Sequence, residues 1–338
     1  KFILQRSIGE SPRFKKWHIC QDRRHMEISF KKIGLEDREQ IDQYLKKKTY
    51  RSCELVFPNI YLWSRKYPTD FAVVEDALVF RGYSDEGEPS ITFPAGEPEQ
   101  AHKAMDAMVE WFRAQGKELR MHLVQEQEFA LLKEWYPGRF QIAYNRDAAD
   151  YVYETEKLTT LAGKKLHGKR NHINKFKEGN PDWVYEPIGE ANVEECFQMA
   201  LKWREETGCE EDEEKRAEIC VTLNALRLFR ELNLKGGLLR TAPGGEVIAF
   251  TIGEPLNADT FVVHIEKAFA EIQGAYPMIN QQFVTHEAQD FQYVNREEDT
   301  GAEGLRKAKL SYHPAFLVEK GVVTYSERRN GGSENDED

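Results

Sequence analysis

Three consecutive strand-like segments followed by a helix, a strand, a second helix and two short strands form the pattern that most constrains this chain. Runs rich in β-branched and aromatic residues predict the strands, and apolar residues at helical spacing predict the helices. The segments are, in order, residues 236–240, 246–253, 260–266, 276–288, 291–297, 303–309, 315–319 and 322–325. We expect the last two strands to pair as a hairpin around Lys320-Gly321. The pattern indicates a mixed sheet flanked by helices.

The first half of the chain shows a similar alternation of helices and strands. Helices are predicted at 35–45, 99–115 and 126–135, and strands at 71–75, 77–81, 90–94 and 119–124. A length of 338 residues favours two domains rather than one core. We therefore predict an α/β (α+β) fold with domains at 1–148 and 149–330, followed by an acidic tail at 331–338.

The five cysteines limit the chemistry that the chain can support. They are odd in number and contain no C-x-x-C pair, which argues against a disulfide framework and a structural zinc site. We expect a reducing compartment and no metal. The sequence shows no signal-peptide pattern and no apolar run of the roughly 20 residues that a membrane span requires. A cytoplasmic protein is the resulting expectation.

The net charge of −11 falls unevenly along the chain. An acidic protein binds nucleic acid poorly unless a local basic patch is present. Residues 164–177 form such a patch, with six Lys or Arg, two His and no acidic residue. This predicted helix either pairs with an RNA backbone or nucleotide, or is a solvated face that balances an acidic neighbour such as 205–214.

Residues 293–314 carry the densest motif. A strand end is followed by a turn containing Gly301 and Gly304, and then by a helix start with Arg306, Lys307 and Lys309. Backbone N–H groups at a helix N-terminus, together with nearby cations, favour binding of a phosphate or carboxylate. The alternative is a tight turn that caps an amphipathic helix.

This motif, together with residues 163–176, 264–268 and 57–63, resembles the catalytic region of bacterial phosphatidylglycerol lysyltransferases and the related DUF2156 group. The resemblance implies two tandem GNAT-like (acyl-CoA N-acyltransferase-like) domains. It also implies transfer of an aminoacyl group from a charged tRNA to a lipid headgroup. The chain departs from the lipid-modifying enzymes because it lacks their multi-span membrane region.

The resemblance also places a site in the C-terminal half. It implies that the strands at 264–266 and 293–295 splay apart, and that residues 272–276, with Gly274, lie where the family binds a pyrophosphate. The binding residues that we infer are Asn295, Arg296, Asp299, Gly301, Gly304, Arg306, Lys309, Gly274, Lys165, Lys169, Arg170 and Asn171.

Acyl transfer needs a neutral nucleophile, a stabilised carbonyl oxygen and a proton for the leaving group. Glu266 is the candidate base, unless it forms a salt bridge with Lys267 or Arg296. Tyr312 is the candidate acid, unless it only packs with a hydrogen-bonded hydroxyl. We interpret His264, on an apolar strand, as a core histidine outside the site.

The sequence predicts an acyl- or aminoacyltransferase whose donor is an acyl-CoA or an aminoacyl-tRNA. Its acceptor is a small molecule or a lipid headgroup, and charged tRNA is a candidate partner. The alternative is a non-catalytic GNAT-like module that binds a nucleotide, tRNA or peptide. In either case we expect the N-terminal half to be structural or to form part of the acceptor wall.

Overall fold

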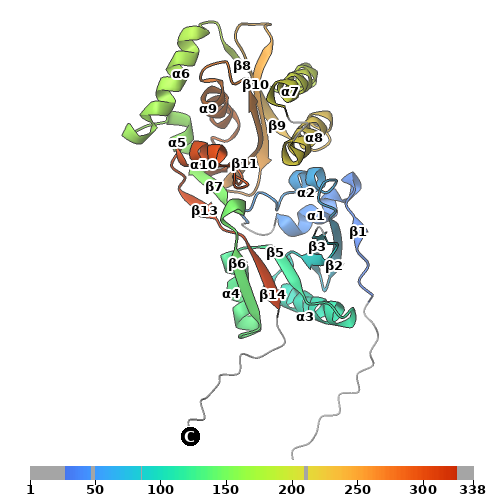
Figure 1. Ribbon diagram of the computed structural model, residues 1–338. Helices are drawn as coiled ribbons and strands as arrows, with labels where there is room; N and C mark the ends of the chain where they lie inside the picture. Colours follow the sequence, from blue (N-terminus) through green and yellow to red (C-terminus); the bar gives the residue numbers. More distant parts are fainter. Residues whose placement is uncertain (1–26, 47–49, 85, 209–211, 326–338) are drawn as a thin grey trace, which may run out of the picture.

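The computed structural model describes residues 27–46, 50–84, 86–208 and 212–325. The acidic tail predicted at 331–338 lies outside these residues. The described chain forms two seven-stranded mixed sheets, each flanked by helices, which stack end to end in Figure 1.

The first sheet is built mainly from the N-terminal half. Its strands, in spatial order, are β1 (Lys31–Lys32), β2 (Asp70–Val74), β3 (Ala77–Tyr83), β4 (Pro89–Ile91), β5 (Arg120–Val124), β14 (Gly321–Tyr325) and β6 (Phe140–Tyr144). Its helices are α1 (Arg38–Leu45), α2 (Phe57–Trp63), α3 (Pro98–Ala114) and α4 (Glu126–Trp135). The apolar face of α3 that the sequence predicts is buried, with Ala104, Met105 and Met108 fully covered.

The second sheet comes from the C-terminal half. Its strands, in spatial order, are β13 (Phe316–Val318), β7 (Asp150–Glu154), β12 (Tyr293–Asn295), β11 (Thr260–Ala268), β10 (Val247–Pro255), β9 (Lys235–Arg240) and β8 (Val184–Pro187). In Figure 1, α5 (Thr155–Thr160), α6 (His167–Gly179) and α9 (Ala275–Glu287) lie on one side of this sheet. The helices α7 (Val193–Thr207) and α8 (Glu213–Arg227) lie on the other side, and α10 (Glu303–Leu310) follows β12.

The predicted closing hairpin is wrong. β13 pairs with β7 in the second sheet, whereas β14 pairs with β5 and β6 in the first. Lys320 is buried at the crossing, where its Nζ donates to Asp150 Oδ1 at 2.7 Å, so the chain runs on between the sheets instead of reversing. Residues 321–325, assigned to a C-terminal domain from the sequence, therefore complete the N-terminal sheet.

One hydrophobic core joins the two halves. Phe57 of α2 and Leu78 of β3 belong to the same buried cluster as Phe250 of β10 and Phe261 of β11. Because apolar burial is the main favourable contribution to folding, this shared core fixes α2 against the second sheet. The N-terminal half thereby reaches the region where β11 and β12 separate.

β11 and β12 pair only over Thr260–Val262 and Tyr293–Asn295. Beyond that point β11 continues to Ala268, whereas Arg296 bonds to the backbone of Tyr151 on β7. His264 is the extra residue of a β-bulge, since Ile252 pairs with Ile265 and Gly253 with Val263. Bulges re-aim side chains, commonly beside active sites. The separation of these two strands is called the splay below.

Candidate active site

Five polar side chains, three from helices and strands and two from the loops that follow β12 and α10, meet on the α9 side of the splay. We call this group the α9 cluster, and it consists of Lys169 (α6), Glu266 (β11), Asn280 (α9), Arg296 (after β12) and Tyr312 (after α10). Four of the five were inferred from the sequence. Asn280 was missed because it lies within an ordinary amphipathic helix and belongs to no motif.

Glu266 is engaged on both of its carboxylate oxygens. Arg296 Nη2 donates to Oε1 at 2.9 Å, and Asn280 Nδ2 donates to Oε2 at 2.9 Å. The salt bridge to Arg296, the alternative weighed from the sequence, is therefore the arrangement that forms. Because both carboxylate oxygens already accept hydrogen bonds, Glu266 is placed to orient Arg296 and Asn280.

Tyr312 lies between two cations. Its ring centroid is 4.0 Å from Lys169 Nζ and 4.8 Å from Arg296 Cζ. Burial raises the pKa of Tyr312 to about 12, although Arg296 opposes the shift, so its hydroxyl keeps its proton at neutral pH. Burial and the charge of Arg296 lower the pKa of Lys169 to about 8. Lys169 is thus partly neutral near pH 8, where it can accept or donate a proton.

Two buried polar atoms of the α9 cluster have no hydrogen-bond partner among the described residues. They are Asn280 Oδ1, an acceptor, and Arg296 Nη1, a donor. Both side chains bind Glu266 through their other polar atom. Buried polar groups in folded proteins are nearly always paired, so this pair marks the cluster as chemically incomplete.

The turn that was predicted to bind an anion is instead held by protein groups. Asn295 is fully buried and donates to Arg51 O at 2.7 Å and to Asp150 Oδ2 at 3.0 Å. Asp299 is fully buried and accepts from Tyr151 and from Arg306 Nε at 2.8 Å. In this conformation the polar atoms of Asn295, Asp299 and Arg306 bind protein groups, and their expected role in binding the acyl or aminoacyl donor stays a prediction.

Lys309 and the glycines of this region also have structural partners. Burial lowers the pKa of Lys309, whose Nζ donates to the backbone oxygens of Arg296 and Glu298. Gly301 has a φ of +83° and lies against Asp147, whereas Gly304 has open space around it. Gly274 has the same φ, and a Cβ there would lie 2.2 Å from His172 O of α6. Close packing of α6 on α9 therefore explains Gly274.

The polar residues of α6 and of the turn before it differ in what they contact. Lys169 reaches the α9 cluster, whereas Arg170 donates to Leu161 O and to Gly163 O at 2.8 Å and so caps α5. Asn171 bonds to His167 on the same helix, and Lys165 is exposed. Of the acidic stretch predicted to balance this face, Glu205 and Glu206 lie in the last turn of α7 and Glu213 and Glu214 in the first turn of α8, on the opposite side of the sheet (Figure 1).

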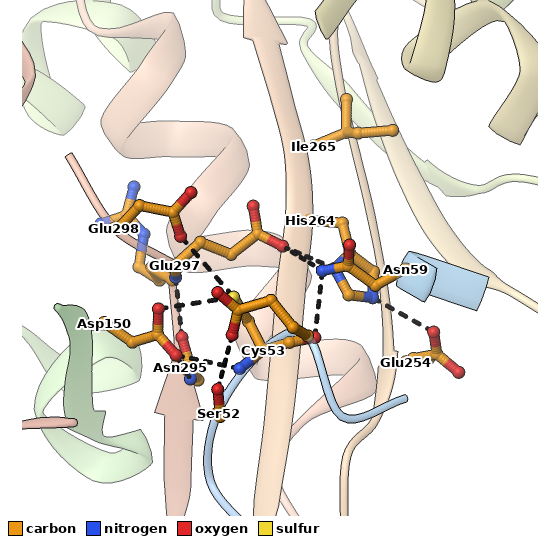
Figure 2. Close-up of polar contacts among 12 residues, drawn as sticks. Ser52, Cys53, Asn59, Asp150, Glu254, His264, Ile265, Asn295, Glu297 and Glu298 are labelled. Atoms are coloured by element: carbon orange, nitrogen blue, oxygen red, sulfur yellow. Dashed lines mark hydrogen bonds and ion pairs between the residues drawn. The ribbon is translucent and has the colours of Figure 1, made fainter. Parts of the chain in front are cut away.

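A second polar group lies at the junction of the two sheets, and Figure 2 shows most of it. We call it the junction network, and it consists of Cys53, Glu54, Asn59, Asp150, Glu254, His264, Asn295, Glu297, Glu298 and Lys320. Lys320 Nζ donates to Glu54 Oε1 at 2.6 Å and to Asp150 Oδ1 at 2.7 Å. Burial opposes its charge, but Asp150 and other neighbours raise the pKa of Lys320 well above its usual value.

His264 is buried, as the sequence predicts, but its partners are charged. Its Nδ1 donates to Glu297 Oε1 at 2.7 Å, and its Nε2 donates to Glu254 Oε1 at 3.1 Å (Figure 2). Burial lowers the pKa of His264, but the two carboxylates outweigh burial and raise it to about 10. Asn59 of α2 also donates to Glu297 Oε1, at 3.2 Å. No sequence spacing links these residues, so only the tertiary fold reveals them.

The junction network includes a set of metal-ligand side chains that the sequence did not lead us to expect. One ligand atom from each of Cys53, Glu54, Asp150 and Glu298 lies within 4.8 Å of the others. The Lys320 ammonium donates directly to three of these side chains, those of Cys53, Glu54 and Asp150. Lys320 therefore supplies the balancing positive charge of this set.

A hollow of about 630 Å³ lies elsewhere, lined by residues of η1 (Leu35–Asp37) and α1 together with Lys46. A hollow lined by consecutive turns of one short helical segment is a surface depression. The assignment of the working site to the C-terminal half consequently rests on the chemistry of the splay and not on a cavity.

Known proteins resemble this chain in sequence and in fold. The family described as phosphatidylglycerol lysyltransferase, C-terminal, matches residues 47–323. The chain belongs to this family. The match covers both sheets and both polar groups, so the resemblance inferred from the sequence is confirmed. The fold is also confirmed as two mixed sheets flanked by helices, an arrangement shared with the structure of FemX, which is 9% identical with a TM-score of 0.50, covering 88% of this chain and 97% of that one.

Two solved structures and one curated protein show how the family varies. A conserved protein of unknown function from Bacteroides thetaiotaomicron is 38% identical, with a TM-score of 0.83, covering 89% of this chain and all of that one. L-PGS from Bacillus licheniformis is 14% identical, with a TM-score of 0.60, covering 86% and 93%. An uncharacterized protein from Mycoplasmoides gallisepticum is 26% identical over 197 residues, which is 56% of this chain and 61% of that protein.

None of the described helices between residues 27 and 325 has both the length and the apolar composition needed to span a bilayer. Family membership supports a transferase.

Proposed function

We propose that the protein transfers an aminoacyl or acyl group to an amine or hydroxyl acceptor, with the α9 cluster as its reaction centre. The observation that carries the proposal is the pairing of Lys169, with a pKa near 8, and the protonated Tyr312 beside the splay. A near-neutral base next to a protonated hydroxyl is the combination that acyl transfer requires.

In the proposed reaction, neutral Lys169 accepts the proton of the acceptor nucleophile as that nucleophile attacks the donor carbonyl. Arg296, oriented by Glu266, stabilises the negative charge that develops on the carbonyl oxygen. The bond between the carbonyl carbon and the donor's oxygen or sulfur then breaks. Tyr312 donates its proton to that leaving group, and the proton held by Lys169 restores the tyrosine, so the enzyme returns to its starting state.

The donor that we propose is an aminoacyl-tRNA, with an acyl-CoA as the competing possibility. Lys165, in the short 3-10 helix η3 (Lys164–Leu166) that precedes α6, and Lys175 of α6 are both exposed and close in sequence to Lys169, and such a surface suits a polyanionic backbone. Gly274 is explained by packing against α6, so no separate observation favours the pyrophosphate of CoA. The acceptor is a small molecule or a lipid headgroup.

A reducing, cytoplasmic compartment belongs to the same proposal. Among the described residues, Cys53, Cys196 and Cys220 are free thiols, and two of them are buried. Free buried thiols suit a compartment in which disulfides do not form. The test is the redox state of these cysteines in protein isolated under alkylating conditions, which we expect to be fully reduced.

The transferase proposal is tested by supplying charged tRNA or acetyl-CoA together with phosphatidylglycerol vesicles or soluble amines, and measuring labelled product. We expect transfer with at least one donor, and a 10²- to 10⁴-fold lower kcat for Tyr312→Phe because the leaving group then loses its proton source. Tyr144→Phe, on the exposed face of β6, is the matched control. An unchanged rate for Tyr312→Phe would remove the α9 cluster from the chemistry.

The second candidate function is a module that binds a nucleotide or tRNA without catalysis. The engagement of both Glu266 oxygens, which leaves no free carboxylate base in the α9 cluster, favours it. Binding of uncharged and charged tRNA with equal affinity, and no product from any donor, would support this candidate over the transferase.

A further inference from the structure

Asn280 lies deep in the second turn of α9 and is only 1% exposed. Its Nδ2 donates to Glu266 Oε2 at 2.9 Å, which fixes the amide so that Oδ1 is the atom left over. Arg296 is fixed in the same way, because Nη2 binds Glu266 Oε1 and Nη1 is left over. The Glu266 carboxylate thus fixes two side chains of the same cluster, and each has one polar atom, an acceptor on Asn280 and a donor on Arg296, without a hydrogen-bond partner.

The chemistry of these two atoms specifies what would satisfy them. Asn280 Oδ1 needs a hydrogen-bond donor, and the neighbouring Glu266 charge favours a cationic one. Arg296 Nη1 needs an acceptor. An α-aminoacyl group carries both, since its ammonium and its carbonyl oxygen are attached to adjacent carbons. An acetyl or fatty acyl group has only the carbonyl oxygen and would leave the amide oxygen unpaired.

We infer that Asn280 is a specificity-determining residue, which accepts a hydrogen bond from the α-ammonium of the donor's acyl group while Arg296 donates to its carbonyl oxygen. The inference rests on the proposed function for the identity of the reaction. A site built to hydrogen-bond a substrate amine rejects the analogue that lacks it, because its own buried polar atom is then left unpaired.

The geometry around Asn280 fits this role. Tyr312 is 5% exposed and covers Arg296, and the half-buried Lys169 covers Tyr312. In the inferred complex the donor enters from the α6 side, past the long side chain of Lys169, and its acyl group reaches Asn280 last.

The test uses small probes so that binding is read independently of turnover. Wild-type protein is titrated with alaninamide and with propionamide, which lacks the amino group, and chemical shifts or heat are followed. We expect alaninamide to bind at least tenfold more tightly in wild type. Asn280→Leu, which keeps the volume but has no acceptor, should abolish that difference. Gln282→Ala, on the same helix, is the matched control and should preserve it.

Transfer assays supply the second arm, with tRNA carrying a free amino acid or the same amino acid N-acetylated. We expect wild type and Gln282→Ala to prefer the free amine, and Asn280→Asp to keep that preference because an acceptor remains. Equal binding of the two amides by wild type, or an unchanged preference in Asn280→Leu, would overturn the inference. Selective amide binding without transfer from any donor would instead overturn only the transferase proposal.

Discussion

The α9 cluster and the junction network both border the splay, yet their polar atoms are satisfied to different degrees. Among the described residues, no side-chain atom of the junction network is buried without a hydrogen-bond partner, whereas Asn280 Oδ1 and Arg296 Nη1 in the α9 cluster are. A fully satisfied buried network fixes one arrangement of the chain, and a half-satisfied one costs stability. This difference indicates that the junction network holds the two sheets together, whereas the α9 cluster has polar atoms that a bound ligand would satisfy.

The largest expected effect is on the junction network. Lys320→Met removes the cation that balances Asp150 and Glu54, which leaves buried carboxylates uncompensated. We expect a loss of about 3–5 kcal/mol in the free energy of unfolding, measured by urea titration. Lys307→Met removes an exposed pair with Glu303 and should change stability by less than about 0.5 kcal/mol. A stability loss as small as this control's would refute the structural role of the network.

The next effect is on the α9 cluster and should appear in activity. The pKa of Lys169 is lowered to about 8, so its neutral fraction grows as the pH rises through 8. We expect kcat/KM of wild type to increase with pH across that range. In Lys169→Met this increase should disappear, and kcat/KM should be roughly 10²-fold lower.

Measurements of stability distinguish the proposed catalytic role of Lys169 from a structural role. Between pH 8 and Lys169's ordinary value of 10.5, the unfolded chain binds more protons at this position than the folded chain, so wild-type stability should rise over that range. Lys169→Met removes this contribution and should not destabilise the protein at pH 7. If Lys169→Met were less stable than wild type at pH 7 and its kcat/KM still rose with pH, Lys169 would have a structural role and not the proposed catalytic one.

A smaller effect concerns Glu298 in the junction network. Burial raises the pKa of Glu298 to about 8, although Lys320 opposes the shift. Between its ordinary value of 4.5 and 8 the folded chain therefore binds more protons than the unfolded one, and stability should fall as the pH rises through that window. Glu298→Gln should flatten this dependence by about 1–2 kcal/mol between pH 5 and 9. Thermal unfolding at both pH values is the measurement, and Glu303→Gln is the exposed control.

The smallest effect is on the face of α6. Lys165→Gln and Lys175→Gln should each weaken RNA binding several-fold, because each removes one phosphate contact. The slope of log K against log salt should fall in magnitude by about 1 per substitution, with stability unchanged. Lys133→Gln on α4 is the control, and equal effects from all three variants would mean that α6 is not the binding face.

The sequence predicted some parts of this arrangement for clear reasons. The order of elements from β9 to α10 follows from local periodicity, and the family resemblance of the motifs implied the GNAT-like assignment. Lys169 and Tyr312 were found because they lie in recognisable motifs. The hairpin at 315–325 was wrong because two adjacent short strands look the same whether they pair with each other or with distant strands. For the turn that contains Asn295 and Asp299, the sequence left anion binding and helix capping both open, because a polar motif gives no sign of whether its partners are ligands or protein groups.

Alone, the sequence determined the helices and strands, the charge of α6 and the chemistry available near the splay, since these depend on local spacing and residue type. The tertiary structure decided which polar groups meet. Lys320 reaches Asp150, His264 reaches Glu297, and Asn280 reaches Glu266 only after distant segments pack. A buried polar atom is satisfied or left open by neighbours far away in the chain, and that is why the candidate site could be assembled only from the fold.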